Sequence, residues 1–208
     1  MSSPARYPVP AAEHRTRDEI SRSRFVTTLA PVATVDEAHA FVARLRAEFP
    51  DATHNCWAFV VGPPASTGRI GMSDDGEPHG TAGRPMLTAL LHSGVGDVAA
   101  VVTRYYGGTK LGTGGLVRAY GGCVARALET LPRAERVTWA RVRVTVGYGD
   151  VTSVQQLVAA HEGRAEAEAY AADVTYDVVL PEGAVAAFAA AVRDATRGQG
   201  VVVASTDG

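Results

Sequence analysis

The residues best suited to binding chemistry lie in the glycine-rich segment 107–115. Its sequence, GGTKLGTGG, has five glycines in nine positions and contains Lys110, the only lysine of the chain. Glycine lets backbone N–H groups approach a bulky anion closely, and the start of a helix adds partial positive charge. Arg104 and Arg118 flank the segment and supply further positive charge. This pattern predicts a site for the phosphate of a nucleotide or of RNA.

The same glycines have a structural interpretation, in which they form a tight crossover packed under a helix. Two known phosphate motifs are not met, because Thr113 stands where the phosphate-binding loop requires lysine and Val117 occupies the third glycine of the dinucleotide motif. The sequence leaves both interpretations open. The predicted anion-binding or nucleic-acid-binding residues are Arg104, Tyr105, Tyr106, Gly107, Gly108, Lys110, Gly112, Gly114, Gly115 and Arg118.

A second group of reactive side chains lies in the segment SDDGEPHGTAGRP, residues 73–85. Asp74, Asp75, Glu77 and His79 have the chemistry to hold a divalent cation, or to act as acid and base, if the loop brings them together. The same composition is typical of turns, with Asx-type hydrogen bonds and glycine in a left-handed conformation. We expect no metal and no cofactor. The alternative is an enzyme that acts on a phosphorylated ligand with magnesium, with Asp74, Asp75 and Glu77 as its catalytic residues.

His54 and Cys56 share one face of a predicted strand at 53–61, where they invite comparison with a pair of zinc ligands. The sequence contains no CxxC or HxxxH partner that would complete such a site. We therefore interpret both residues as part of the core. No GxSxG motif is present, and no serine stands out as a nucleophile.

The strand that precedes the glycine-rich segment is predicted at 97–106. Its unbroken apolar run is typical of a strand buried on both faces. It ends at Tyr105 and Tyr106, whose rings can stack on the bases of single-stranded RNA. Since neighbouring strand residues point to opposite faces, we expect one tyrosine to pack inward and the other to border the glycine-rich segment. After that segment, apolar residues at helical spacing predict a helix that ends before Pro132.

The remaining N-terminal elements follow from periodicity and capping residues. A strand is predicted at 20–31, followed by a helix that Thr34 caps and Pro50 ends. The strand at 53–61 leads into a long Gly/Pro-rich stretch with a short strand near 69–73. A further helix has Pro85 in its first turn. Loops as long as 62–83 are usually functional or disordered, which favours a binding role for this stretch.

The pattern changes from residue 136 onward. Here the order strand, helix, strand, strand, helix, strand is predicted, which is the ferredoxin-like βαββαβ arrangement. We therefore predict an α+β protein with a flexible N-terminal arm at 1–16, an N-terminal domain at 17–133 and a ferredoxin-like C-terminal domain at 136–208.

Composition excludes several classes of protein. The chain has 208 residues, 46% hydrophobic and 20% charged, which is ordinary globular composition. No apolar run approaches the roughly 18 residues that a membrane span needs, so no membrane association is predicted. A net charge of −2 excludes a uniformly basic nucleic-acid binder but not a local basic patch. Two cysteines cannot form a disulfide framework, which favours the reducing cytoplasm.

Two long motifs carry a resemblance to a known family. The segments DDGEPHGTAGRPML and AAVVTRYYGGTKLGTGGLVRAYGG resemble the signature of the YigZ/IMPACT family. The resemblance implies that the N-terminal domain is an α/β sandwich similar to the second domain of a small-subunit ribosomal protein, a superfold shared with GHMP kinases. It also implies a C-terminal domain similar to the last domain of elongation factor G. His79 departs from the small residue expected at its position.

The resemblance also implies a role in translation, since eukaryotic relatives regulate translation by competing for a scaffold protein that bacteria lack. We expect a regulatory protein rather than an enzyme, with RNA, the ribosome or a translation-related protein as its partner. Its predicted binding surface is the glycine-rich basic groove.

Overall fold

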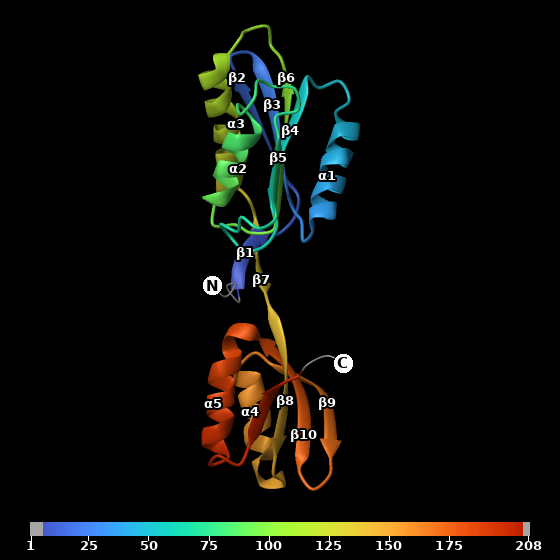
Figure 1. Ribbon diagram of the computed structural model, residues 1–208, viewed down its shortest axis with the longest axis vertical. Coiled ribbons are helices and arrows are strands. Elements are labelled where there is room, and N and C mark those ends of the chain that lie inside the picture. The colour runs from blue at the N-terminus through green and yellow to red at the C-terminus, as the bar shows by residue number, and fades with distance from the viewer. Residues whose placement is uncertain (1–5, 206–208) are drawn as a thin grey trace. The chain divides into compact units, whose positions relative to one another are not determined.

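The computed structural model describes residues 6–205, which form two compact units. One unit spans Tyr7–Arg136, and the other contains Arg6 and the described residues from Val137 onward. Both combine helices with sheets, so the predicted α+β class is confirmed in its coarse form (Figure 1). The N-terminal elements are β1 (Arg6–Pro10), β2 (His14–Ile20), β3 (Ser23–Pro31), α1 (Val35–Glu48), β4 (His54–Val60), β5 (Ile70–Ser73), α2 (Gly83–Leu91), β6 (Val98–Tyr105), α3 (Gly112–Glu129) and β7 (Arg133–Val137).

A five-stranded sheet organises the N-terminal unit. Its strand order is β2-β3-β6-β4-β5, and every neighbouring pair is antiparallel. Helix α1 covers one face, and α2 and α3 cover the other (Figure 1). The central strand β6 contributes Val102 to the core under α2 and α3 and Val101 to the core under α1. The predicted burial of this strand on both faces is therefore confirmed.

The helices begin where capping residues and proline predict. The hydroxyl of Thr34 accepts a hydrogen bond from the backbone N–H of Glu37, which caps α1. Pro85 lies in the first turn of α2. Helix α3 starts at Gly112, inside the glycine-rich segment, and buries an apolar face that includes Leu116 and Tyr120.

The predicted N-terminal arm is wrong for the residues that the structure describes. Residues 6–10 form β1, which pairs with β7, and β2 forms the edge of the five-stranded sheet. Tyr7 is buried, and its hydroxyl donates to Asp97 Oδ2 at 2.7 Å. The partner strand of β1 lies far along the chain, so local sequence patterns do not reveal the pairing. Residues 1–5 of the predicted arm lie outside the described residues.

The predicted strand at 20–31 is shorter in the structure because a hairpin divides it from β2. Ser21 and Arg22 form the two-residue turn with positive φ angles of 48° and 65°. Turns of this kind usually contain glycine, asparagine or aspartate. Neither residue carries that signal, so the sequence did not predict the hairpin.

The C-terminal unit has the predicted order of strands and helices. Its sheet order is β11-β8-β10-β9, and one core contains side chains of both helices and the sheet. Both helices lie on the same face of this sheet (Figure 1). The elements are β8 (Trp139–Val146), α4 (Val151–Ala160), β9 (Arg164–Tyr170), β10 (Val174–Pro181), α5 (Val185–Ala195) and β11 (Val201–Ala204), with short 3₁₀ turns at Tyr148–Asp150 and Glu182–Ala184. Within residues 6–205, no helix is both long and apolar enough to span a bilayer.

Candidate functional site

The sheet register brings three residues together at the start of α3. Arg104 on β6 pairs with Phe25 on β3 and with His54 on β4. Residues directly opposite each other on neighbouring strands share a face of the sheet, so these side chains all point toward the α2 and α3 side. Phe25 lies in the core on that side, and Arg104 is 5% exposed. The sheet therefore holds a charged side chain at the edge of an apolar core.

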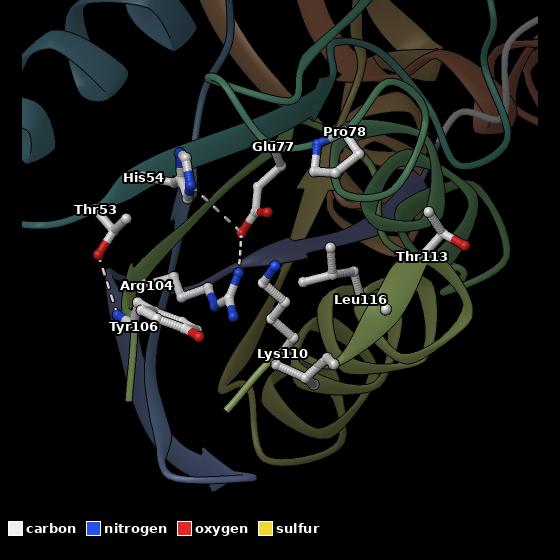
Figure 2. Close-up of a pocket in the computed structure, with 11 residues that line it drawn as sticks. Thr53, His54, Glu77, Pro78, Arg104, Tyr106, Lys110, Thr113 and Leu116 are labelled. Atoms are coloured by element: carbon white, nitrogen blue, oxygen red, sulfur yellow. Dashed lines mark hydrogen bonds and ion pairs between the residues drawn. The ribbon is translucent and has the colours of Figure 1, made fainter. Parts of the chain in front are cut away.

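Glu77 and Arg104 form a buried ion pair (Figure 2). Arg104 Nη1 donates to Glu77 Oε1 at 2.6 Å, and the side chains are 6% and 3% exposed. Tyr120 Oη donates to the same carboxylate oxygen at 2.8 Å, and Arg104 Nη2 donates to Ser23 Oγ at 3.2 Å. His54 Nε2 lies 3.8 Å from Glu77 Oε1. Burial raises the pKa of Tyr120 far above its ordinary value, so its hydroxyl is a neutral donor.

Asp74 folds the loop that carries Glu77. Its two carboxylate oxygens accept hydrogen bonds from the backbone N–H groups of Gly80, Ala82 and Gly83 at 2.8–2.9 Å. These bonds close the loop and satisfy donors at the start of α2, which lacks a side-chain cap at Ala82. The predicted turn chemistry of this segment is therefore confirmed.

The acidic residues of this loop point to different places. Asp75 accepts a hydrogen bond from the backbone N–H of Asn55 at 2.7 Å and pairs with Arg46, whereas Glu77 pairs with Arg104. No group of three or more potential metal-ligating side chains is found among residues 6–205. The alternative of magnesium-assisted catalysis by Asp74, Asp75 and Glu77 is not supported, because each carboxylate is engaged by a different part of the protein.

The hydrogen bonds of Asp74 predict a contribution to stability that is lost in acid. Burial raises the pKa of Asp74, but the N–H groups of Gly80, Gly83 and Ala82 lower it by more, so the net pKa lies below the ordinary value. A carboxyl with a lowered folded-state pKa stabilises the fold fully above its unfolded pKa of about 4, and this stabilisation is lost as the pH falls through the folded-state pKa. Asp74→Asn is expected to be less stable than the parent at neutral pH and to lose less stability on acidification.

Urea unfolding of the parent and of Asp74→Asn, from about pH 7 to about pH 3, measures this difference. The gap in free energy of unfolding between the two proteins should narrow as the pH falls below about 4. A gap that stays constant over this range would show that Asp74 is not the group responsible.

A cavity of about 380 Å³ opens beside the buried ion pair. Figure 2 shows Lys110 and Arg104 extending toward the carboxylate of Glu77 from different segments of the chain. The volume of this cavity lies within the range of small-molecule sites, roughly 300–1,000 Å³. We call it the first cavity; it is lined by Thr53, His54, Glu77, Pro78, Arg104, Tyr106, Lys110, Leu111, Gly112, Thr113 and Leu116.

A second cavity, of about 310 Å³, adjoins the first and shares Lys110 and Leu111 with it. Arg118 of α3 also lines it, together with Ser21 at the hairpin turn. Neither Lys110 nor Arg118 has a carboxylate within ion-pair distance in the part of the chain that the structure describes. The second cavity therefore contains two unmatched positive charges.

The glycine-rich segment serves the backbone geometry first. A Cβ atom on Gly107 would lie 1.8 Å from the carbonyl oxygen of Arg22, so only glycine fits this close approach. Gly108 and Gly112 have positive φ angles of 85° and 69°. Gly114 has no such requirement, because its nearest neighbour would be Arg118 Nη1 at 3.7 Å. The structural interpretation therefore accounts for most of these glycines, whether or not the segment binds an anion.

Backbone donors nevertheless remain free at this segment. Gly107 N–H donates to Ser23 Oγ at 3.3 Å, but no acceptor among residues 6–205 engages the N–H groups of Gly108 and Thr109. Helix α3 begins after Leu111 with no side-chain cap and no acidic residue in its first turn. The segment before α3 thus has unpaired N–H groups at Gly108 and Thr109, and the start of the helix at Gly112 adds partial positive charge beside the first cavity.

The structure brings together only part of the predicted set. Tyr106 is 46% exposed and lines the first cavity, whereas Tyr105 lies away from it, donating to Asp51 at 3.1 Å. Arg104 is not a free countercharge, because Glu77 matches its charge. Arg104, Tyr106, Lys110 and Gly112 line the first cavity, Lys110, Gly115 and Arg118 line the second, and Gly107, Gly108 and Gly114 line neither within the described chain.

Several cavity residues were not predicted as binding residues. His54 was interpreted as a core residue, yet it lines the first cavity and its Nδ1 bonds to the backbone carbonyl oxygen of Asp75 at 2.8 Å. The apolar wall formed by Pro78, Leu111 and Leu116 carries no local signal for binding. Only the pairing of His54 with Arg104 across β4 and β6 reveals its place, and that register is a tertiary property.

The fold and the site define a two-domain α/β protein in which a glycine-rich segment and a buried Glu–Arg pair border a cavity. Residues 21–128 match the Impact N-terminal domain, and residues 144–199 match a domain of unknown function, DUF1949. The chain belongs to the IMPACT family, so the resemblance carried by the two sequence motifs is confirmed.

Relatives match over most of the chain. IMPACT family member YigZ of Escherichia coli is 46% identical over 190 residues, which cover 91% of this chain and 93% of that protein. An IMPACT family member of Haemophilus influenzae is 39% identical over 198 residues, covering 95% and 96% of the two chains. A solved structure titled "Crystal structure of an hypothetical protein" is 43% identical with a TM-score of 0.68, covering 99% of this chain and all of that one.

Proposed function

We propose that this protein is a translation-associated regulator that binds RNA, free or on the ribosome, through the basic groove beside α3. This groove consists of the first and second cavities. Membership of the IMPACT family supports the regulatory, translation-associated part of this proposal. The proposed function requires no metal and no cofactor. A translation-related protein with an acidic surface is the competing partner, and the experiment below distinguishes it.

One observation carries the choice of an anionic partner. Lys110 and Arg118 line the second cavity without a matching carboxylate within residues 6–205, and the free backbone N–H groups of Gly108 and Thr109 directly precede Lys110. Lysine, arginine and helix N-termini are the groups that contact phosphates in nucleic-acid complexes. A polyanion gains affinity by releasing counterions when such groups neutralise its phosphates.

Reversing both charges is expected to abolish most RNA binding. The variant Lys110→Glu with Arg118→Glu replaces two attractions to phosphate with two repulsions, so its affinity for single-stranded RNA should fall at least about tenfold. Fluorescence titration with RNA and co-sedimentation with ribosomes measure the loss. The matched control is Arg193→Glu with Arg197→Glu, which makes the same change in net charge at two exposed arginines of the C-terminal unit.

The control variant should bind RNA and ribosomes as the parent does. Equal binding by the parent and the Lys110/Arg118 variant would contradict the proposal. A third outcome is that the parent binds ribosomes but not free RNA and that the Lys110/Arg118 variant no longer binds ribosomes. This outcome would assign the groove to a protein partner instead.

A cytoplasmic location is part of the proposal. Cys56 and Cys123 are both free and buried, as expected of thiols in a reducing compartment. Burial raises the pKa of each thiol to about 12, so neither is a reactive thiolate at neutral pH.

The superfold of each unit is also proposed rather than settled. The sheet order β11-β8-β10-β9, with α4 and α5 on one face, supports the ferredoxin-like assignment of the C-terminal unit. A sheet between α1 and the pair α2 and α3 supports an α/β sandwich like the ribosomal protein domain shared with GHMP kinases.

A further inference from the structure

The two adjoining cavities differ in chemistry. The first has apolar walls from Pro78, Leu111 and Leu116 and the ring of Tyr106 at its edge. The second contains Lys110 and Arg118 and no carboxylate among its lining residues. Both cavities share Lys110 and Leu111, so they adjoin. A ligand that occupied both would need a flat apolar part joined to an anionic part.

The first cavity has polar groups that suit the edge of a heteroaromatic ring. His54 Nδ1 bonds to the backbone carbonyl oxygen of Asp75, and because a carbonyl only accepts, Nδ1 carries the proton. In the neutral imidazole, Nε2 is then an acceptor on the cavity side (Figure 2). Thr113, whose hydroxyl is both donor and acceptor, also lines the cavity. These groups can exchange hydrogen bonds with ring nitrogens and exocyclic amines.

The charge of the first cavity also favours an anionic ligand. Arg104 and Lys110 extend toward Glu77, so the first cavity has two cationic side chains and a single carboxylate. Arg104 is 5% exposed, and its Nε is a buried donor that has no hydrogen-bond partner within residues 6–205. Native proteins seldom leave such a donor unpaired.

We propose that the two cavities hold one nucleotide of a single-stranded RNA, with its base in the first cavity and its phosphate in the second. The inference rests on the proposed function and specifies that the groove recognises a single nucleotide of the RNA chain. A base released from stacking is read by an aromatic side chain and by hydrogen bonds to its edge, which Tyr106 and His54 supply. A paired duplex cannot present its bases in this way, so the groove distinguishes single strands from duplexes.

The test compares ligands that share a phosphate backbone and differ in their bases. Fluorescence anisotropy of the full-length protein measures the affinity for a twelve-nucleotide single-stranded RNA, for the same chain without bases and for the duplex. The single strand should bind at least about tenfold more tightly than the abasic chain or the duplex. Tyr106→Ala should weaken binding of the single strand about tenfold and leave the abasic chain unaffected.

Three further variants keep the result interpretable. Tyr106→Phe retains the ring and should bind as the parent does. Tyr148→Ala removes an exposed tyrosine from the C-terminal unit and should have no effect. Thr113→Trp places a bulky ring at the exposed edge of the first cavity and should reproduce the loss seen with Tyr106→Ala. Each variant changes an exposed residue, so the fold should tolerate it.

The outcomes separate this inference from the proposed function. Equal binding of the abasic chain and the single strand, with no effect of Tyr106→Ala or Thr113→Trp, would overturn the base pocket while the RNA groove stands. Absence of all RNA binding by the parent would overturn both. A mononucleotide that binds as tightly as the twelve-nucleotide strand would overturn the assignment to an RNA chain.

Discussion

Glu77→Ala is expected to destabilise the N-terminal unit by about 3–5 kcal/mol, because it leaves the buried guanidinium of Arg104 without its counterion. The side chains of Glu77 and Arg104 are 3% and 6% exposed, so the guanidinium loses its counterion in a largely buried site. The hydroxyl of Tyr120 also loses its acceptor. Urea unfolding, followed by far-UV circular dichroism, measures the loss in free energy of unfolding.

A second variant shows that the effect comes from the pairing of charges. Glu77→Leu combined with Arg104→Met replaces the pair by apolar side chains, and buried ion pairs replaced in this way often cost little stability. The double variant should therefore be more stable than Glu77→Ala alone. The free energy of unfolding is also measured for Glu77→Leu and Arg104→Met singly. A double variant whose loss equals the sum of these two losses would show that the two side chains act independently.

Gly107→Ala is the second large effect expected. The new Cβ would lie 1.8 Å from the carbonyl oxygen and 2.1 Å from the carbonyl carbon of Arg22. Both contacts are with backbone, so the chain must move the hairpin turn or the end of β6 to relieve them. We expect a loss of about 3 kcal/mol in the free energy of unfolding, at the upper end of the usual range for overpacking.

The matched control is Gly114→Ala in the first turn of α3. Its Cβ would meet only Arg118 Nη1 at 3.7 Å, and alanine favours the helix by roughly 0.5–1 kcal/mol over glycine. Gly114→Ala should therefore be neutral or slightly stabilising. Similar midpoints of thermal unfolding for Gly107→Ala and the parent would contradict the close approach of Gly107 to the hairpin turn at Arg22.

The sequence predicted the elements that depend on local chemistry. The cap at Thr34 and the apolar run of β6 each mark an element directly, and both elements are found. The hairpin at Ser21 and Arg22 is not predicted because neither residue type is typical of positive φ angles. The close approach of Gly107 to Arg22 is a contact between distant parts of the chain, so local sequence does not reveal it. Strand β1 is not predicted because its partner strand, β7, is separated from it by most of the sequence of the N-terminal unit.

The candidate site was predicted only in part, for a related reason. The glycine-rich segment and Lys110 were found from composition and spacing, and Lys110 does line both cavities. Glu77 was grouped with Asp74 and Asp75 because they are neighbours in sequence. The loop instead turns Glu77 toward Arg104, since Asp74 is held by backbone N–H groups at the start of α2. Pairings of this kind depend on register and loop closure, which local spacing does not encode.

The salt dependence of RNA binding tests whether Lys110 and Arg118 neutralise phosphates of the RNA. Each cation that neutralises a phosphate of single-stranded RNA adds about 0.7 to the negative slope of log affinity against log salt concentration. Replacing Lys110 and Arg118 by alanine should therefore lower the slope by about 1.4, whereas Arg193→Ala with Arg197→Ala should leave it unchanged. An identical slope for the parent and the Lys110/Arg118 variant would show that RNA does not bind at this groove.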